Sequence, residues 1–203
     1  MSAQIRLPPP SKRGVMSLEE AIAKRRSVRD FAPDPISQVQ LSQILWAAQG
    51  ITDVSEGLRS VPSAGATYPL KIFVVCSKSC VEGIDEGVYY YNVNNHSLTL
   101  HYKGDARLDL ARAALSQSCI YEAPIDIIIC ALYRRTASRY GGRGERYVYI
   151  EVGHAGQNIY LQATALGLAT VAIGAFSDEQ VREILRLEKQ YKPLYIMPVG
   201  RPA

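Results

Sequence analysis

The chain has 203 residues, 47% of them hydrophobic and 21% charged, and this length suits one globular domain with a core of its own. The composition excludes a disordered chain, a collagen-like repeat and a coiled coil. The formal net charge of +4 is scattered along the chain, so we expect no nucleic acid partner.

The four cysteines form no C-x-x-C pair, which disfavours a zinc ribbon or a disulfide scaffold. Cys76 and Cys130 lie in apolar runs, and we expect both to be small buried residues. The first 14 residues contain no apolar segment of the kind found in secretory signals. The uncharged stretch 153–177 contains too many polar residues and glycines for a membrane helix. We therefore predict a cytoplasmic protein without a membrane partner.

Three serines mark the expected helix starts. Ser17, Ser37 and Ser177 are each followed three residues later by Glu or Gln, the spacing of a capping box. The second of these helices is expected to end at Gly50. Residues 50–69 are rich in Gly, Ser, Thr and Pro and too long for a simple connection, which predicts a functional loop.

Runs of β-branched, aromatic and other apolar residues predict five or six strands. They cover residues 70–76, 87–91, 97–102, 125–132, 168–175 and 194–199. The run 125–132 is almost continuously apolar, so it is expected in the middle of a sheet with both faces covered. Pro198 cannot donate to a strand ladder, which places the last strand at an edge or puts this residue at a strand end.

Two further helices are expected over residues 105–115 and 145–166. The longer one is apolar or small nearly all round, and Gly153, Ala155 and Gly156 would allow another backbone to approach closely. We therefore expect a buried central helix at a subunit interface. The mixture of strands and about five helices predicts an α+β fold.

Common catalytic signatures are missing from the sequence. It contains no G-x-G-x-x-G after a strand, no Walker lysine loop and no nucleophile elbow, since Val61 stands two residues before Ser63. His96 and His101 fall on opposite faces of a strand, and His154 is interpreted as a structural histidine. No metal site is expected, so an enzyme of this sequence would take its reactivity from a cofactor.

An anion-binding segment follows the first helix. If residues 25–29 are extended, Arg25, Ser27 and Arg29 point the same way and present two guanidinium groups and a hydroxyl to one target. Such a set suits a phosphate dianion. From these residues alone, a solvated basic helix end favoured by the helix dipole remains the alternative.

Three segments together resemble the FMN-dependent nitroreductase superfamily: RRSVRDF at 25–31, PSAGATYPL at 62–70 and GHAGQNIYLQATALGLATVAIGAF at 153–176. The resemblance spans residues 17–202, and PSAGATYPL with Glu151-x-Gly153-His154 is most similar to the branch of thiazole/oxazole-forming (azoline) dehydrogenases. It implies a mixed or antiparallel sheet of about five strands flanked by helices, in an interlocked homodimer. Residues 17–203 would form a single nitroreductase-like FMN-binding domain after an N-terminal extension, 1–16.

The resemblance also implies where FMN would bind, at two sites in the subunit interface. The phosphate and ribityl end would be held by Arg25, Ser27 and Arg29, with Arg26 contributing through its backbone. The isoalloxazine ring would be reached from the other subunit by Pro62, Ser63, Ala64 and Gly65.

The same resemblance assigns the far end of the flavin. Gln117 would read the pyrimidine edge, and the turn at Gly174 and Ala175 would aim a backbone N–H at flavin N5. A donor at N5 can orient the hydride-transferring atom without covering its face.

Two departures from the family pattern matter. Many relatives add a C-terminal Lys or Arg to the phosphate cluster, and here Arg201 is the remaining candidate. Azole-forming dehydrogenases resemble one another in a Lys-Tyr pair, for which Arg139-Tyr140 is the nearest counterpart. Tyr140 is our candidate proton donor, in a Gly-containing stretch before the central helix; an exposed tyrosine in a flexible loop is the alternative.

The leading hypothesis is an FMN-dependent oxidoreductase that passes hydride from NADH or NADPH to a nitroaromatic, a quinone or a similar small-molecule acceptor. The first alternative is a flavin dehydrogenase that oxidises a substrate such as a peptide azoline, with O₂ as acceptor. The second is a non-catalytic flavin-binding protein that acts as a carrier or sensor.

Overall fold

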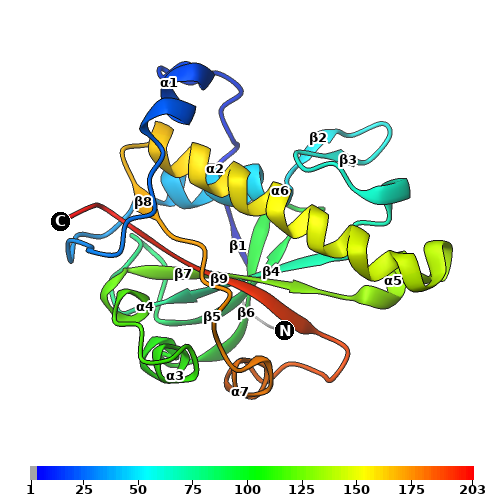
Figure 1. The fold of residues 1–203 in the computed structure, drawn as a ribbon. Coiled ribbons are helices and arrows are strands. Elements are labelled where there is room, and N and C mark those ends of the chain that lie inside the picture. Colours follow the sequence, from blue (N-terminus) through cyan, green and yellow to red (C-terminus); the bar gives the residue numbers. More distant parts are fainter. Residues whose placement is uncertain (1–3) are drawn as a thin grey trace.

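An antiparallel sheet of seven strands forms the centre of the computed structural model, which describes residues 4–203 (Figure 1). Across the sheet the strands follow the order β1-β6-β5-β4-β7-β9-β8. In chain order they are β1 (Gln4–Arg6), β4 (Leu70–Cys76), β5 (Gly87–Asn92), β6 (Ser97–Lys103), β7 (Ile125–Ala131), β8 (Ala169–Thr170) and β9 (Lys192–Gly200). The loop predicted over residues 50–69 holds a separate hairpin of β2 (Ile51–Asp53) and β3 (Leu58–Arg59), followed by the short 3-10 helix η1 (Ala64–Ala66).

Helices cover both faces of this sheet (Figure 1). Helices α2 and α6 share one core with it, and α3, α4 and α7 share the other. The bounds are α1 (Leu18–Lys24), α2 (Gln38–Gln49), α3 (Arg107–Ala113), α4 (Cys119–Glu122), α5 (Tyr133–Tyr140), η2 (Gly141–Arg143), α6 (Gly144–Ala165) and α7 (Asp178–Ile184). The predicted α+β class and the helix-flanked sheet are confirmed.

The three predicted serine caps are present. Ser17, Ser37 and Ser177 each accept a hydrogen bond from the backbone N–H three residues later. At Ser37 the capping box is closed in both directions, because the Gln40 side chain accepts from the Ser37 N–H. Helix α2 ends at Gly50, as predicted.

Strand β7 lies in the interior of the sheet, as its composition predicts. It pairs with β4 on one side and β9 on the other, and all seven of its residues are buried. Ile127 and Ile129 belong to the core under α2 and α6, whereas Ile128 belongs to the opposite core. β7 therefore contributes side chains to both cores. Burying each side chain of this size stabilises the fold by roughly 1.5–3 kcal/mol.

The strand predicted over residues 168–175 is shorter than expected. Only Ala169 and Thr170 pair regularly, as β8. Further along, the Ala172 N–H donates to the hydroxyl of Tyr160 on α6 at 2.7 Å instead of to a neighbouring strand. The chain therefore contacts α6 at Ala172 and pairs with β9 once more at Ile173.

Strand β9 is not an edge strand, although Pro198 does lie near its end. Ile196 exchanges both of its backbone hydrogen bonds with Ile173. Backbone N–H groups of a strand point alternately to its two neighbours, so the nitrogen of Pro198, two residues later, faces the same neighbour as that of Ile196. On that side β8 pairs only with Val199 and Gly200. In this register Pro198 lies opposite Val171, and because proline has no N–H the ladder is interrupted between β8 and Ile173.

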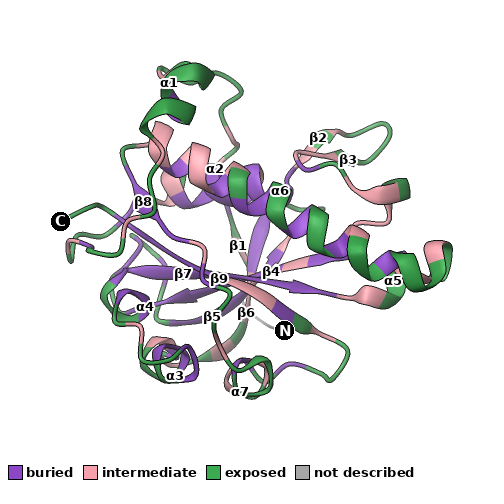
Figure 2. Ribbon diagram, viewed as in Figure 1, coloured by how far each residue is buried: buried purple, intermediate pink, exposed green. Residues whose placement is uncertain are grey.

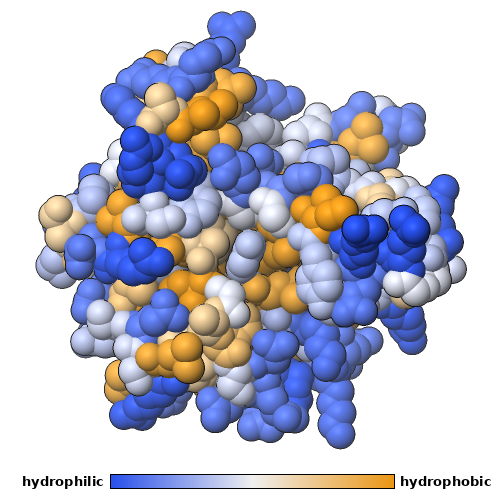
Figure 3. Space-filling model, in the orientation of Figure 1, coloured by the Kyte–Doolittle hydropathy of each residue, from blue (hydrophilic) through white to orange (hydrophobic). Residues whose placement is uncertain are grey.

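Helix α6 begins one residue earlier than predicted and ends one residue earlier, but it is not buried all round (Figure 2). One stripe is exposed in the single chain and comprises Arg146, Tyr149, Ile150, Gly153, His154 and Gln157. His154 is exposed in the single chain, and burial of this face in a subunit interface stays a prediction. Apolar side chains are also exposed at α1, where Leu18 and Ile22 lie one turn apart (Figure 3).

All four cysteines are buried and free, including Cys76 and Cys130 as expected. No helix within residues 4–203 combines the length and the apolar character needed to cross a membrane.

Candidate active site

The segment 25–29 is extended and runs beside β8. Ser27 bridges Thr170 in a parallel sense, and the Val28 N–H donates to the Thr170 carbonyl at 3.1 Å. Ser27 and Arg29 are exposed and Arg25 is half-buried. This is the extended geometry on which the phosphate-site interpretation depends.

Tyr160 of α6 links this segment to the chain beyond β8, and the sequence analysis gave it no role. Its hydroxyl lies 2.9 Å from the Ser27 hydroxyl, and the Arg25 guanidinium carbon lies 5.2 Å from the centre of its ring. The same hydroxyl accepts the Ala172 N–H. Because one lone pair is taken by Ala172, Tyr160 can give its proton to Ser27 and leave the Ser27 proton free for a ligand.

Arg26 differs from its two arginine neighbours. Its guanidinium donates to the carbonyls of Ala23 at 2.9 Å and Arg25 at 2.7 Å, at the C-terminal end of α1. The side chain thus stabilises the helix end, where a cation is favoured by the helix dipole. Two of the five guanidinium N–H groups of Arg26 are thus engaged at the helix end, which leaves its backbone for the ligand contact that the family resemblance implies.

Gln117 and the turn at Gly174 and Ala175 lie together, although 58 residues separate Gln117 from Ala175 in the chain. The Gln117 side-chain amide donates to the Ala114 carbonyl at 3.0 Å and to the Ala175 carbonyl at 3.4 Å. Gly174 is exposed, and a Cβ added there would lie 3.7 Å from the Tyr195 ring. Packing within the chain therefore does not require glycine at 174, but its absence of a side chain leaves the turn backbone open.

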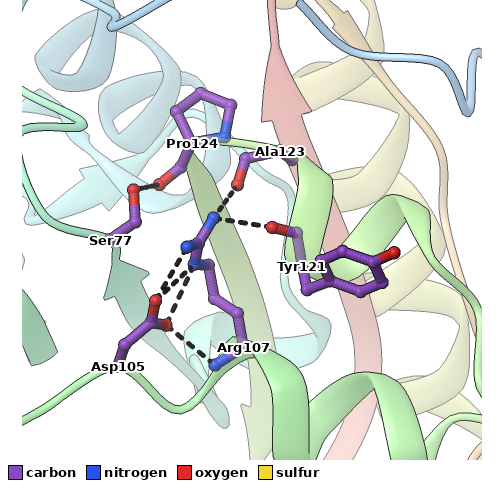
Figure 4. A network of polar contacts seen from close by, with 6 residues as sticks. All are labelled: Ser77, Asp105, Arg107, Tyr121, Ala123 and Pro124. Atoms are coloured by element: carbon purple, nitrogen blue, oxygen red, sulfur yellow. Dashed lines mark hydrogen bonds and ion pairs between the residues drawn. The ribbon is translucent and has the colours of Figure 1, made fainter. Parts of the chain in front are cut away.

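Arg107 anchors the α3–α4 segment that carries Gln117 (Figure 4). Its guanidinium is paired with Asp105 at 2.7 Å and donates to the carbonyls of Tyr121 at 2.8 Å and Ala123 at 2.6 Å. On the other side of this turn, Ser77 donates to the Pro124 carbonyl at 3.1 Å (Figure 4). These contacts satisfy the carbonyls at the C-terminal end of α4 and hold it against β7.

The C-terminal residues return to the basic segment. The Ala32 N–H donates to the Arg201 carbonyl at 3.0 Å, and the Ala203 N–H donates to the Asp30 carbonyl at 3.1 Å. Arg201 is exposed. The backbone at Arg201 therefore runs beside the chain that follows Arg29.

The segment Pro62–Gly65 lies elsewhere, between α5 and the middle of α6. Ser63 donates to the Glu151 carboxylate of α6 at 2.5 Å, and Arg139 donates to the Gly65 carbonyl at 3.0 Å. Gly65 has a φ of +57°, and a Cβ there would approach the Tyr140 hydroxyl to 2.6 Å. Glycine is required at this position both by its backbone angle and by the neighbouring tyrosine.

Tyr140 closes α5 and is part of ordered helical structure, so the expectation of a flexible loop is wrong. Its ring packs edge-on against Tyr147, with centroids 5.1 Å apart, and Arg139 lies 5.7 Å from its centre. Tyr140 therefore belongs with the Pro62–Gly65 segment of its own chain.

The predicted site residues thus form two groups, attached to different parts of α6 (Figure 1). Tyr160 contacts the phosphate-type segment through Ser27, whereas Glu151 contacts the other segment through Ser63. These two helix residues are nine positions apart, which corresponds to about 13 Å along the axis. Within one chain, the basic segment 25–29 and the Pro62–Gly65 segment therefore do not contact the same phosphate-sized group.

A cavity of about 560 Å³ opens next to Gly174. Its walls include the aromatic and apolar Tyr133, Tyr149, Phe176 and Leu194 and the charged Glu145, Asp178 and Lys192. This volume and these aromatic and apolar walls suit a planar ring system. No cluster of side chains able to hold a metal ion occurs in the part of the chain that the structure describes.

Comparison of the sequence with known protein families identifies the family of this chain. The model of the nitroreductase family matches residues 22–201, and the chain belongs to this family of oxidoreductases. It is 51% identical to the nitroreductase-family protein MJ1384 of Methanocaldococcus jannaschii, over 92% of this chain and 91% of that protein.

Two further similarities bear on the fold and the branch. A crystal structure of a nitroreductase-family protein from Ralstonia eutropha JMP134 superposes with a TM-score of 0.87 and 27% identity, covering 98% of this chain and 90% of that one. The trifolitoxin operon protein TfxC of Rhizobium leguminosarum is 29% identical over 89% of this chain, which spans 54% of TfxC. The predicted family resemblance is confirmed.

The residues present fit FMN. Within residues 4–203, neither Arg25 nor Arg29 forms an ion pair with a carboxylate, so both charges are free for a phosphate. The Tyr160 hydroxyl contacts both Ser27 and Ala172, and two residues after Ala172 the chain reaches the open turn at Gly174. This turn lies beside a cavity of suitable size for a ring.

Proposed function

We propose that the protein is an FMN-dependent oxidoreductase that takes hydride from NADH or NADPH and passes it to a nitroaromatic, a quinone or a similar acceptor. The observation that carries the proposal is the convergence of Arg25 and Ser27 on Tyr160, whose hydroxyl also holds the chain leading to Gly174 and its cavity. Family membership supports the same class of chemistry.

Each residue has a defined task in this proposal. Arg25 and Arg29 bind the FMN phosphate with charge-assisted hydrogen bonds, and Ser27 donates the proton that Tyr160 leaves free. The bound flavin supplies an atom that accepts and returns hydride. The backbone at Gly174 and Ala175 orients that atom, and Gln117 lies close enough to Ala175 to read the adjoining ring edge. Arg201 adds positive charge near the phosphate.

The second half of the site comes from a second copy of the chain. The Pro62–Gly65 segment contacts α6 nine residues away from Tyr160, and by the family resemblance it would reach the flavin ring in the partner's site of a two-fold dimer. The exposed stripe of α6 and the apolar residues of α1 supply a surface for such a homodimer. Tyr140, packed against Gly65, would then reach the flavin of the partner and serve as proton donor to the acceptor.

An anaerobic titration tests the proposal. Purified protein loaded with FMN should lose its flavin absorbance when NADH or NADPH is added, and a nitroaromatic or quinone should restore it. FAD should not replace FMN, because the fold offers no dinucleotide-binding crevice. Failure to bind FMN at micromolar concentration would overturn the proposal.

The resemblance of PSAGATYPL and Glu151-x-Gly153-His154 to azoline dehydrogenases favours one second candidate, a flavin dehydrogenase that oxidises a substrate such as a peptide azoline with O₂ as final acceptor. The Arg139-Tyr140 pair stands where azole-forming enzymes resemble one another in Lys-Tyr. If FMN binds but neither nicotinamide reduces it anaerobically, while an azoline peptide does, this second function is the correct one.

A further inference from the structure

Glu151 is a buried carboxyl group to which the hydride chemistry above assigns no task. It is 2% exposed, on the side of α6 that faces the sheet. One of its oxygens accepts the hydrogen bond from Ser63, whereas the other makes no hydrogen bond of good geometry among the described residues and is influenced by the buried side-chain amide of Gln49. An unpartnered buried carboxylate oxygen is costly, so its presence calls for a reason.

Ser63 has little hydrogen-bonding freedom while Glu151 is ionised. Its only proton is donated to Glu151, and its oxygen accepts the Tyr68 N–H at 2.9 Å. The hydroxyl therefore cannot donate to anything outside the chain. This conflicts with any donation by the Ser63 hydroxyl to the flavin, although the resemblance names Ser63 without assigning the contact to its side chain.

Protonation of Glu151 resolves that conflict. A protonated carboxyl can donate to the Ser63 oxygen, which then accepts from both Glu151 and Tyr68 and turns its own proton outward. Burial raises the pKa of the Glu151 carboxyl to about 7, against the opposing effects of the Ser63 hydrogen bond and the cationic Arg59 and Arg135. Both protonation states are thus populated near neutral pH.

We propose that Glu151 is a positioning residue that sets the direction of the Ser63 hydroxyl, so that Ser63 donates a hydrogen bond to the flavin of the partner subunit only when Glu151 is protonated. This inference rests on the proposed FMN function. The charged groups that act on Glu151 come from two other elements, Arg59 from β3 and Arg135 from α5, and both favour the ionised state. A fall in pH is therefore needed to release the Ser63 proton.

The expected consequence is a pH-dependent difference in FMN affinity. One added neutral hydrogen bond strengthens binding by about three- to tenfold. The FMN phosphate also titrates, with a second pKa of about 6, and this changes affinity in every variant alike. The ratio of two dissociation constants measured at the same pH removes that common effect.

The test measures FMN dissociation constants by flavin fluorescence between pH 6 and 8.5 for the full-length protein and for Glu151→Gln. The glutamine amide is uncharged at every pH and can donate to Ser63, so it imitates the protonated carboxyl. The two proteins should bind FMN alike at pH 6, and the wild type should bind about three- to tenfold more weakly at pH 8.5. Glu82→Gln, an exposed substitution, should match the wild type throughout.

Ser63→Ala separates this role from a general effect on folding. The single variant Ser63→Ala is compared with the double variant that also carries Glu151→Gln. The ratio of their FMN dissociation constants should be the same at pH 6 and pH 8.5. If Glu151→Gln does not fold, the comparison of Ser63→Ala with the wild type serves instead, and their ratio should change across the same range.

The outcomes distinguish the two proposals. A pH-independent ratio, or a pH-dependent ratio that persists with alanine at 63, overturns the role of Glu151 and leaves the FMN function standing. Absence of FMN binding by the wild type at every pH overturns both.

Discussion

Tyr160→Phe removes one hydroxyl that holds two parts of the proposed phosphate site together. The hydroxyl accepts the Ala172 N–H at 2.7 Å and lies 2.9 Å from the Ser27 hydroxyl. Phenylalanine keeps the ring and its contact with Arg25 but offers no oxygen to either group. The Ala172 N–H then loses its partner in a half-buried position.

The expected magnitudes follow from these two bonds. Loss of the partner of the Ala172 N–H should lower the free energy of unfolding by about 1–2 kcal/mol. Ser27 loses the donor that leaves its own proton free for the phosphate, so FMN affinity should fall by about three- to tenfold. Urea unfolding of the apoprotein at one protein concentration measures the first, and a flavin fluorescence titration measures the second.

Tyr121→Phe is the matched control, because its exposed hydroxyl makes no hydrogen bond within residues 4–203. It should leave both quantities unchanged. If Tyr160→Phe also binds FMN within twofold of the wild type and unfolds within about 0.3 kcal/mol of it, Tyr160 does not organise this site.

Three other substitutions have defined outcomes. Arg29→Ala should weaken FMN binding about ten- to hundredfold by removing a charge-assisted contact, whereas the surface substitution Arg112→Ala should not; equal effects in a fluorescence titration would contradict the phosphate assignment. Tyr140→Phe should slow the half-reaction that protonates the acceptor by about 10², at constant FMN occupancy; if both half-reactions stay within twofold in stopped flow, water is the proton source. Asp126 is fully buried without a hydrogen-bond partner among residues 4–203, and burial raises the pKa of its carboxyl well above the usual range, against the attraction of nearby Arg107. The folded chain thus keeps a proton that the unfolded chain releases above about pH 4, so the stability of the wild type falls relative to Asp126→Asn as pH rises from 4 to 7. Urea unfolding that shows the same difference at both pH values would refute this.

The sequence predicts the regular elements well because their signals are local. The serine caps, the apolar run of β7 and the length of α6 each depend on residues close together in the chain. The errors arise where a distant partner decides the conformation. Strand β8 is short because Pro198 on β9, which lies opposite Val171, has no N–H to donate, and no pattern within residues 168–175 reveals that neighbour.

The same distinction holds for the candidate site. The family motifs locate the basic segment, the Pro62–Gly65 segment and the Gly174 turn, because each is a short run of characteristic residues. Tyr160 and Glu151 lie on α6 and belong to segments that carry the family resemblance, but the motif does not say which part of the chain either side chain contacts. Their spacing of nine residues gains meaning only once the fold shows which segment each one contacts.

The most direct test of the account is whether each FMN site is built from two chains. One variant carries Arg25→Ala and Arg29→Ala, and the other carries Gly65→Val, which places a branched side chain at a φ of +57° and against the Tyr140 hydroxyl. Each variant alone should bind FMN weakly. A mixed dimer, purified through two different tags, then contains one site in which both halves are intact, and the account predicts one tightly bound FMN per mixed dimer. If the mixed dimer binds no FMN tightly, both halves of the site come from one chain and the account is wrong.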